Sequence, residues 1–379
     1  MASVTSPVLG TRALNRATLA RQLLLSRADM SARDAVAHLV GLQAQNVKPP
    51  YFQLHARLAG FRPEELGRLM EEREVVRMVT MRSTIHTHTV EDARSLRLLV
   101  QGARDREVQY FRKGLAGVDL EALAARARGF VEEEPRTMAE IREELLRAWP
   151  GADPQSLAVA ARCLLPLVQV TPRGVWGRSG QVRLTTLENW ARGGGEKGGG
   201  EKGGGEEGVR EEGGGIDGLV LRYLGGFGPA SVKDMQTWSG LTRLREAFER
   251  LRPRLLTFRD EHGVELFDLP DAPRPDAGTP APPRFLPEFD NLLLSHADRT
   301  RVVPPEFKGR NTHGNQSRCA LLVDGFLAGV WASAAGVVTV ELFREVAGGV
   351  QEEIAAEGEA MLAALGEGPG TVRFGSIPG

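Results

Sequence analysis

The sequence predicts an α+β protein in which three consecutive winged-helix units are followed by a small β-barrel. Short helices followed by two strands recur three times, which is the order of elements in a winged helix. After Pro283 the pattern changes to short strands bounded by Asp and Gly turns, which is typical of a curled sheet or barrel. A Gly/Glu/Lys tract and a Pro-rich stretch separate these parts. We expect units at 12–115, 116–190 and 216–270, a disordered insertion at 191–215 and the barrel at 284–379.

The first unit is predicted from helix-start signals and one alternating segment. Ser31 is a capping residue before an apolar-periodic run, and Pro63 suits the first turn of a helix. We interpret Pro49-Pro50 as a break between helices. Helices are therefore expected at 18–26, 31–43, 51–59 and 63–73, and a β-hairpin at 75–90.

The second and third units repeat this plan. Thr137 and Glu140 form a capping box before an amphipathic run, and Ser231 caps another helix. Gly225-Gly226 is a suitable helix end. We expect helices at 137–149, 153–167, 216–224, 231–240 and 241–251, with strand pairs within 167–186 and 255–269. The barrel region is expected to contain strands within 284–303, 319–333 and 337–346 and a helix at 352–365.

Composition excludes several classes of protein. A hydrophobic content of 41% and a charged content of 26% are ordinary for a globular protein, and no run of about 18 apolar residues predicts a membrane span. The N-terminus shows no signal-peptide pattern, and two cysteines are too few for a disulfide framework, so we expect a cytoplasmic protein.

Charge is uneven along the chain, although its net value is −1. Residues 1–115 hold 18 Lys and Arg against 11 Asp and Glu, and the remainder holds 30 against 38. A basic N-terminal third fits a DNA-contact surface on one face, and it fits an arginine-rich genome equally well.

Familiar catalytic signatures are missing from the sequence. It contains no phosphate-binding P-loop, no dinucleotide fingerprint, no His-Glu-x-x-His and no Cys-x-x-Cys, so neither a cofactor nor a metal is predicted. His86 and His88 share one face of an expected strand, but no third metal ligand accompanies them. We interpret them as residues that contact phosphate or pack the base of the hairpin.

The most informative segment is Gln43-Ala44-Gln45. In a helix these two glutamines would diverge by roughly 200°, whereas in an extended segment they point the same way. With Asn46 as a helix-ending residue, we expect both side chains to leave the helix and project together. Two amides can hold a water and a sugar or base edge by hydrogen bonds, but neither is a general base. The chemistry is thereby limited to substrates whose leaving group is already activated.

Three blocks in order resemble one bacterial family. They are Leu-Gln-Ala-Gln-x-x-x-Pro-Pro at 42–50, Arg-Ser-Thr-Ile-His-Thr at 82–87, and Leu-Pro-Glu-Phe-Asp-Asn-Leu-Leu-Leu-Ser-His-Ala-Asp-Arg at 286–299. The chain resembles the winged-helix DNA glycosylases of the azinomycin-resistance type, the family of AlkZ and YcaQ, over about residues 12–350. The resemblance implies tandem winged helices closed by a β-barrel, as expected above.

The resemblance also implies an activity and site residues. Family members remove N7-alkylated purines, and some unhook interstrand crosslinks made through guanine N7. Their catalytic triplet matches Gln43, Ala44 and Gln45, in the version with two glutamines rather than Gln and Asp. No lysine is suggested as a Schiff-base nucleophile, so we expect a monofunctional glycosylase that leaves an abasic site.

The partner is then duplex DNA with alkylated or crosslinked purines, bound by a monomer without cofactor. A barrel hairpin that turns near 311–315 would probe the DNA. The predicted DNA contacts are Lys48, Arg82, Thr84, His86, Arg310, Asn311 and His313. Two alternatives stay open: a non-catalytic winged-helix regulator, and a family member with a degraded site that only binds damage.

Overall fold

The structure, a computed structural model, describes residues 6–192, 215–313, 316–366 and 370–377. The first part contains β1 (Val8–Leu9), α1 (Thr11–Arg21), α2 (Ala32–His38), β2 (Leu42–Gln43), α3 (Pro49–Arg57), α4 (Pro63–Glu71), β3 (Val75–Val79), η1 (Met81–Ser83), β4 (Ile85–Thr89), α5 (Val90–Leu99), α6 (Gln101–Tyr110) and η2 (Arg112–Leu115). The second contains α7 (Leu120–Glu133), α8 (Met138–Ala148), α9 (Pro154–Leu164), β5 (Leu167–Gln169), β6 (Leu184–Thr186) and α10 (Leu187–Arg192). The third contains α11 (Gly215–Phe227), α12 (Val232–Ser239), α13 (Arg245–Leu251), η3 (Arg252–Arg254), β7 (Leu256–Asp260) and β8 (Glu265–Asp268). The last contains β9 (Arg284–Leu286), α14 (Asn291–Leu294), η4 (Pro305–Phe307), β10 (Thr312–His313), β11 (Gln316–Ser317), β12 (Cys319–Val323), β13 (Phe326–Ala334), β14 (Val337–Leu342), α15 (Gly348–Ala364) and β15 (Thr371–Phe374).

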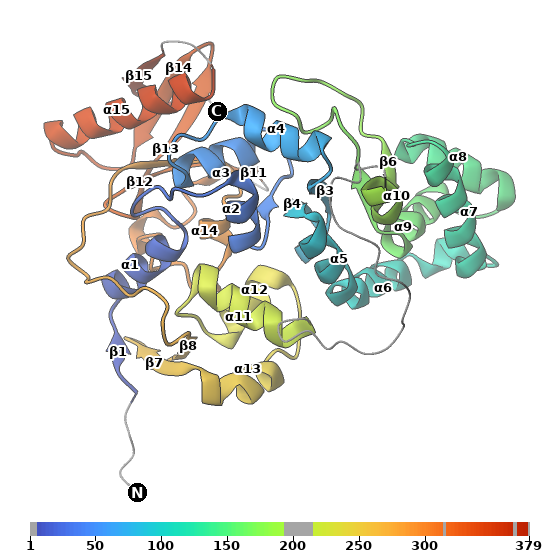
Figure 1. The fold of residues 1–379 in the computed structure, drawn as a ribbon, viewed down its shortest axis with the longest axis horizontal. Helices are drawn as coiled ribbons and strands as arrows, with labels where there is room; N and C mark the ends of the chain where they lie inside the picture. The colour runs from blue at the N-terminus through green and yellow to red at the C-terminus, as the bar shows by residue number, and fades with distance from the viewer. Residues whose placement is uncertain (1–5, 193–214, 314–315, 367–369, 378–379) are drawn as a thin grey trace, which may run out of the picture.

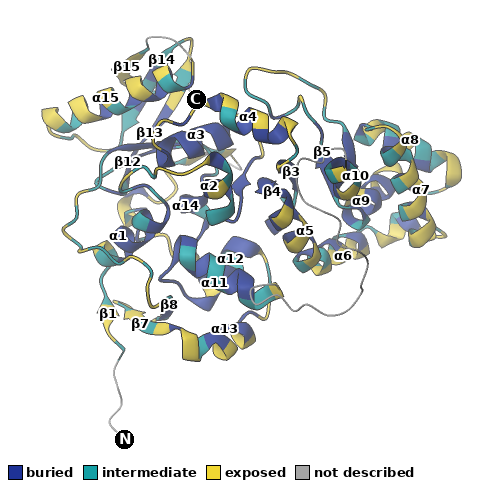
Figure 2. Ribbon diagram, in the orientation of Figure 1, coloured by how far each residue is buried: buried dark blue, intermediate teal, exposed yellow. Residues whose placement is uncertain are grey.

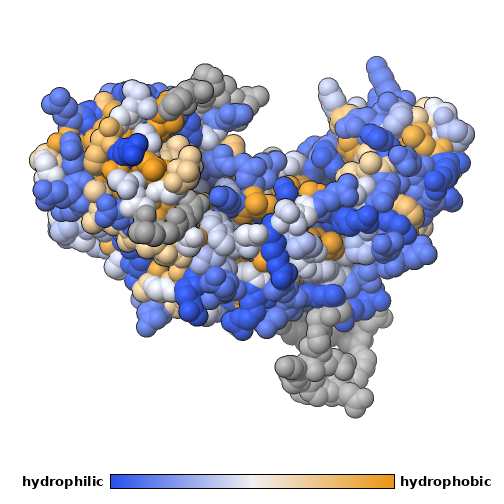
Figure 3. All heavy atoms as spheres, turned by 90° about the horizontal axis from the view of Figure 1, so that it is seen from above, coloured by the Kyte–Doolittle hydropathy of each residue, from blue (hydrophilic) through white to orange (hydrophobic). Residues whose placement is uncertain are grey.

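These elements form two lobes. The helices α7, α8 and α9 lie at one end, and the first helices lie with the C-terminal sheet at the other (Figure 1). Seen from above, the surface is hollowed between the two lobes (Figure 3). The predicted α+β class is confirmed.

The hairpins of the first two units join into one sheet. Its strand order is β2-β4-β3-β5-β6, and β3 pairs with β5 through Arg77↔Gln169 and Met78↔Val168. The expected strand pairs at 75–90 and within 167–186 are confirmed, although the loop between β5 and β6 is longer than a tight turn. The shared sheet ties the α7–α10 lobe to the strands that neighbour Gln43.

Local signals placed the helix starts correctly where a side chain supplies the cap. Ser31 and Ser231 each accept a hydrogen bond from the backbone N–H three residues on, and Thr137 completes its capping box with Glu140. Such caps satisfy backbone donors that have no partner inside the helix. The helices that they begin are α2, α12 and α8.

Two helix starts in the first unit were predicted wrongly. The first helix spans Thr11–Arg21 rather than 18–26, because it begins at Gly10, whose missing side chain gives no capping signal. Pro49 and Pro50 do not interrupt a helix but begin α3, since proline suits a first turn that needs no N–H partner. All nine residues of α3 are buried, at the centre of the larger lobe (Figure 2).

The remaining strands of the described residues form three further sheets. β1 runs parallel to β7 in the sheet β1-β7-β8, and β10 pairs with β11. The C-terminal sheet has the order β15-β14-β13-β12-β9, and α15 packs against it. Whether this sheet closes as the expected small β-barrel stays a prediction, as do the unit boundaries. Of the predicted insertion at 191–215, residues 193–214 lie outside the described residues.

Several arginines of the basic N-terminal third are turned inward. Arg16, Arg21 and Arg57 are buried and pair with Asp324, Asp268 and Asp290 of the C-terminal half. A buried guanidinium needs such a partner to offset its desolvation. These three arginines therefore hold the two halves of the chain together and are not part of a DNA-contact surface.

Candidate functional site

The Gln43-Ala44-Gln45 segment begins in a strand at Gln43 and bends at Gln45. β2 pairs with β4 through Leu42↔Thr87 and Gln43↔His86, and the Ala44 N–H donates to the Ile85 carbonyl at 2.8 Å. The expected extended conformation is therefore present at Gln43, but the segment does not unwind from a helix end, because α2 already ends at His38. The reversal occurs at Gly41, whose φ is +96°. A Cβ there would lie 2.1 Å from His88 Nδ1, so only glycine fits.

Both glutamine side chains reach the turn that joins β3 to β4. Gln43 is 4% exposed, and its Oε1 accepts a hydrogen bond from Arg82 Nη2 at 2.6 Å. Gln45 is exposed, and its Oε1 accepts from the Ile85 N–H at 3.4 Å. The two amides thus differ: the first is enclosed and fixed by an arginine, and the second lies at the surface.

Arg82 is a positioning residue more than a surface cation. Besides Gln43, its guanidinium donates to the Trp238 carbonyl of α12, so it links the site to the third unit. Burial lowers the pKa of Arg82 to about 10, and the nearby Arg299 adds to the decrease. Arg82 adopts a left-handed backbone at φ 52°, a conformation that side chains seldom take outside tight turns.

A second buried arginine fixes the backbone of the triplet. Arg77 Nη2 donates to the Ala44 carbonyl at 2.9 Å, and its Nη1 donates to the Asn46 carbonyl at 3.5 Å. Burial lowers the pKa of Arg77 to about 10, and the Arg173 charge lowers it further. Ala44 is enclosed between these contacts, so the triplet has little room to move.

The 286–299 block lies directly against the triplet. Asn291 Nδ2 donates to the Gly41 carbonyl at 2.7 Å, and Asn291 Oδ1 accepts from the Gln43 N–H at 3.4 Å. Asp290 forms a buried ion pair with Arg57 at 2.7 Å, and Asn46 donates a hydrogen bond to Glu288. Two blocks some 240 residues apart therefore form one site.

His86 and His88 lie inside the protein. Both are at most 1% exposed, their rings stack at 5.4 Å, and the Thr80 hydroxyl lies within hydrogen-bond distance of both. Burial lowers the pKa of His88 to about 4 and the pKa of His86 well below its usual value. His86 is not placed to contact DNA here; of the two interpretations, packing beneath the hairpin is the one observed.

The other predicted DNA contacts lie in different places. Lys48 is exposed, with Nζ 5.5 Å from the Trp176 ring centroid, beside a pocket of about 240 Å³. Thr84 donates its hydroxyl to the Met81 carbonyl inside the β3–β4 turn. Arg310 is exposed on the Phe343 ring at 4.1 Å, and Asn311 is half-buried. His313 ends β10, and its side chain lies outside the described residues.

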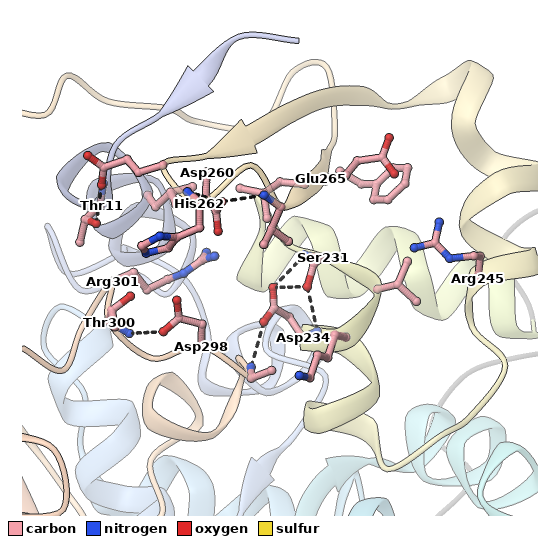
Figure 4. Close-up of a pocket in the computed structure, with 18 residues that line it drawn as sticks. Thr11, Ser231, Asp234, Arg245, Asp260, His262, Glu265, Asp298, Thr300 and Arg301 are labelled. Atoms are coloured by element: carbon pink, nitrogen blue, oxygen red, sulfur yellow. Dashed lines mark hydrogen bonds between the residues drawn. The ribbon is translucent and has the colours of Figure 1, made fainter. Parts of the chain in front are cut away.

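Two further pockets flank this region. One pocket, of about 500 Å³, is lined by Arg299, Lys308 and Asn311. It therefore lies between Arg299, which is near Arg82, and the base of the β10–β11 hairpin. Another of about 360 Å³ lies between α12, the β7–β8 hairpin and Arg301 (Figure 4). Asp234 already accepts hydrogen bonds there from Ser231 and Ala297, and Glu261 accepts from Thr11; the pocket does not include the triplet.

Several site residues escaped the analysis of the sequence. Arg77, Asn46, Glu288 and Asn291 carry no local signal for a role near Gln43, because their contacts depend on the fold. The family resemblance of the 286–299 block was the one sequence signal that indicated a role for Glu288 and Asn291. Within the described ranges, no cluster of three or more His, Cys, Asp or Glu could hold a metal ion. No helix among those residues is long and apolar enough to cross a membrane.

Comparison with known proteins gives matches to a family model and to solved structures. The family model of the AlkZ-like DNA glycosylases matches residues 36–364. Among solved structures, the chain is similar to the Streptomyces sahachiroi DNA glycosylase AlkZ, with a TM-score of 0.75 and 19% identity, over 97% of this chain and 100% of that one. No curated protein matches the sequence.

Proposed function

Because the chain belongs to the AlkZ-like DNA glycosylase family, we propose that it excises N7-alkylated purines from duplex DNA and leaves an abasic site. The observation that carries this proposal is the fixed placement of two glutamine amides at one turn. Gln43 is held by Arg82 and Gln45 by the Ile85 N–H. We propose that the substrates include interstrand crosslinks joined through guanine N7. We also propose that the protein acts as a monomer in the cytoplasm.

The substrate suits a site without a strong acid. An N7-alkylated purine carries a positive charge, so the C1′–N9 bond breaks with its electron pair passing to a base that leaves neutral. Water then forms a bond to C1′ of the cationic sugar and loses a proton. Amides that are already oriented can hold the water and the sugar without the reorganisation that solvent would need.

The roles of the two amides follow from their different surroundings. Since Arg82 occupies the carbonyl side of Gln43, the amide nitrogen of Gln43 lies on the opposite side. We assign Gln43 to orienting the nucleotide and the exposed Gln45 to holding the attacking water. Lys48 and the pocket with Arg299, Lys308 and Asn311 are assigned to the DNA backbone.

The test is a duplex with a single N7-methylguanine, incubated with the protein and then heated in alkali. We expect strand scission at the abasic site. Gln45→Ala should lower the single-turnover rate roughly 100-fold or more, with DNA affinity and melting temperature unchanged. Gln155→Ala, an exposed glutamine at the start of α9, is the matched control and should react as the wild type does.

Two outcomes would overturn the proposal. DNA binding without scission in the wild type would leave a non-catalytic DNA-binding protein or a degraded site. Full activity in Gln45→Ala would show that the triplet is not the site.

A further inference from the structure

A carboxylate lies beside the glutamine triplet, where the sequence suggested only amides. Glu288 Oε1 accepts a hydrogen bond from Asn46, the residue that follows Gln45, across 242 residues of sequence. Glu288 is half-buried, while Gln45 and Asn46 are exposed. The carboxylate therefore lies at the edge of the same open surface as Gln45.

The backbone around Glu288 is held on both sides. Asp290 is fixed by its buried pair with Arg57, and Asn291 bonds to the Gly41 carbonyl and the Gln43 N–H. Between them Phe289 has a φ of 58°, a costly conformation for a bulky side chain. Strained residues persist where the surroundings over-determine them, which is common at functional sites. The loop thus keeps Glu288 next to Asn46.

The two acids of this loop have different partners. Asp290 is neutralised by Arg57 and completely buried. Glu288 instead meets the neutral amide of Asn46, so its charge is not neutralised by that partner. Hydrolysis of a glycosidic bond passes through a cationic, oxocarbenium-like sugar, and carboxylates commonly stabilise such a sugar. Neither Gln43 nor Gln45 can supply a negative charge.

We propose that Glu288 supplies this charge and receives the proton of the attacking water. This inference rests on the function proposed above. As the C1′–N9 bond breaks, the base takes the electron pair and the Glu288 carboxylate stabilises the positive sugar. The water oxygen then bonds to C1′, one water proton passes to Glu288, and solvent later removes it. Glu288 takes the part that an Asp at the third position of the triplet, in place of Gln45, would take.

The first test separates charge from hydrogen bonding. Glu288→Gln keeps the shape and removes the charge, and we expect its single-turnover rate on N7-methylguanine duplex to fall roughly 100-fold. DNA affinity and melting temperature should not change. Asn46→Ala removes the contact and keeps the charge, and should lose clearly less activity. Glu353→Gln, an exposed glutamate of α15, is the matched control and should equal the wild type.

The second test is a rescue. In the Glu288→Gln background, Gln45→Asp returns a carboxylate to the same surface and should restore part of the lost rate. Glu288→Asp, which keeps the charge on a shorter side chain, should retain more activity than Glu288→Gln. This variant decides the question even if Glu288→Gln fails to fold, because Glu288→Asp as inactive as Gln45→Ala contradicts the proposal.

The outcomes also distinguish this inference from the proposed function. No abasic sites from the wild type would overturn the function itself. An active wild type with an equally active Glu288→Gln would overturn the inference alone. Equal losses in Glu288→Gln and Asn46→Ala, with no further loss when the two are combined, would overturn it as well, because Glu288 would then act only by holding Asn46.

Discussion

The segment that carries Gln43 and the β10–β11 hairpin are held in opposite ways. The Gln43 segment has contacts on every side: β4, Arg77, Arg82 and Asn291 all bond to it. The hairpin consists of two strands of two residues each, with exposed side chains at Thr312 and Gln316. One region is fixed before substrate arrives, and the other is open to a large partner.

This difference in rigidity indicates that the two regions have different roles in the proposed function. A site that positions amides for hydrolysis gains from rigidity, since a misplacement of about 1 Å can cost roughly 100-fold in rate. A loop that follows DNA needs exposed polar groups more than fixed ones. Breaking the fixed region should therefore affect stability and activity together, whereas changing the hairpin should affect DNA affinity alone.

The largest effect is expected from Arg57→Ala. The change leaves Asp290 buried without its partner and removes the donors to Gln22 and the Gln53 carbonyl. The free energy of unfolding should fall by about 3–5 kcal/mol, as measured by urea denaturation. Arg68→Ala, which breaks an exposed pair with Glu72, should change it by less than about 1 kcal/mol. A small loss for Arg57→Ala would show that the Glu288 loop is not held by this pair.

The second-largest effect is expected from acid, which should destabilise the fixed region. Burial lowers the pKa of His88 to about 4, whereas an unfolded histidine titrates near pH 6.5. Between these values the unfolded chain binds more protons, so stability falls as the pH drops from about 6.5 towards 4. His88 alone should contribute a loss on the order of 3 kcal/mol. His86, whose pKa is also lowered, acts in the same direction.

Urea denaturation at several values between pH 4 and pH 7 measures this dependence. His88→Gln should lower stability at pH 7 and flatten the dependence. His262→Gln, at the exposed turn after β7, should leave the dependence as it is in the wild type. A wild-type stability that does not change between pH 6.5 and pH 4.5 would contradict a neutral, buried His88.

The sequence predicted what local chemistry determines. The Thr137–Glu140 capping box and the cap Ser231 mark helix starts by contacts that span three residues, and both are present. Gln43 and Gln45 were singled out because an extended segment puts alternate side chains on one side, and the segment is a strand at Gln43 and bends at Gln45. Pro49-Pro50 was misjudged because proline marks a helix start as readily as a helix break.

Contacts between distant parts of the chain could not be predicted from local sequence patterns. Nothing near Asn291 says that it bonds to Gly41, 250 residues away, and nothing near Arg21 says that it pairs with Asp268. The arginine content fitted a DNA surface and an arginine-rich genome equally well, and the fold uses several of those arginines as internal partners for acids. The burial of His86, which was predicted to contact DNA, could not be predicted either, because burial of a polar strand residue depends on what packs over it.

The smallest effect on stability is expected from Arg310→Ala in the open region. Arg310 is exposed, rests on the Phe343 ring at 4.1 Å and donates to the Phe343 carbonyl at 3.3 Å. Its removal should change the free energy of unfolding by less than about 0.5 kcal/mol. If Arg310 contacts phosphate, Arg310→Ala should lower the affinity for the N7-methylguanine duplex. The slope of log Kd against log salt concentration should also decrease by about one.

Fluorescence anisotropy at several salt concentrations measures both quantities. Arg147→Ala, an exposed arginine of α8 paired with Glu144, serves as the control for general loss of positive charge. An Arg310→Ala protein that binds DNA with the wild-type salt slope would remove the hairpin from the proposed DNA surface. The pocket of Arg299, Lys308 and Asn311 would then be the nearer basic surface to Gln43, because Arg299 lies beside Arg82.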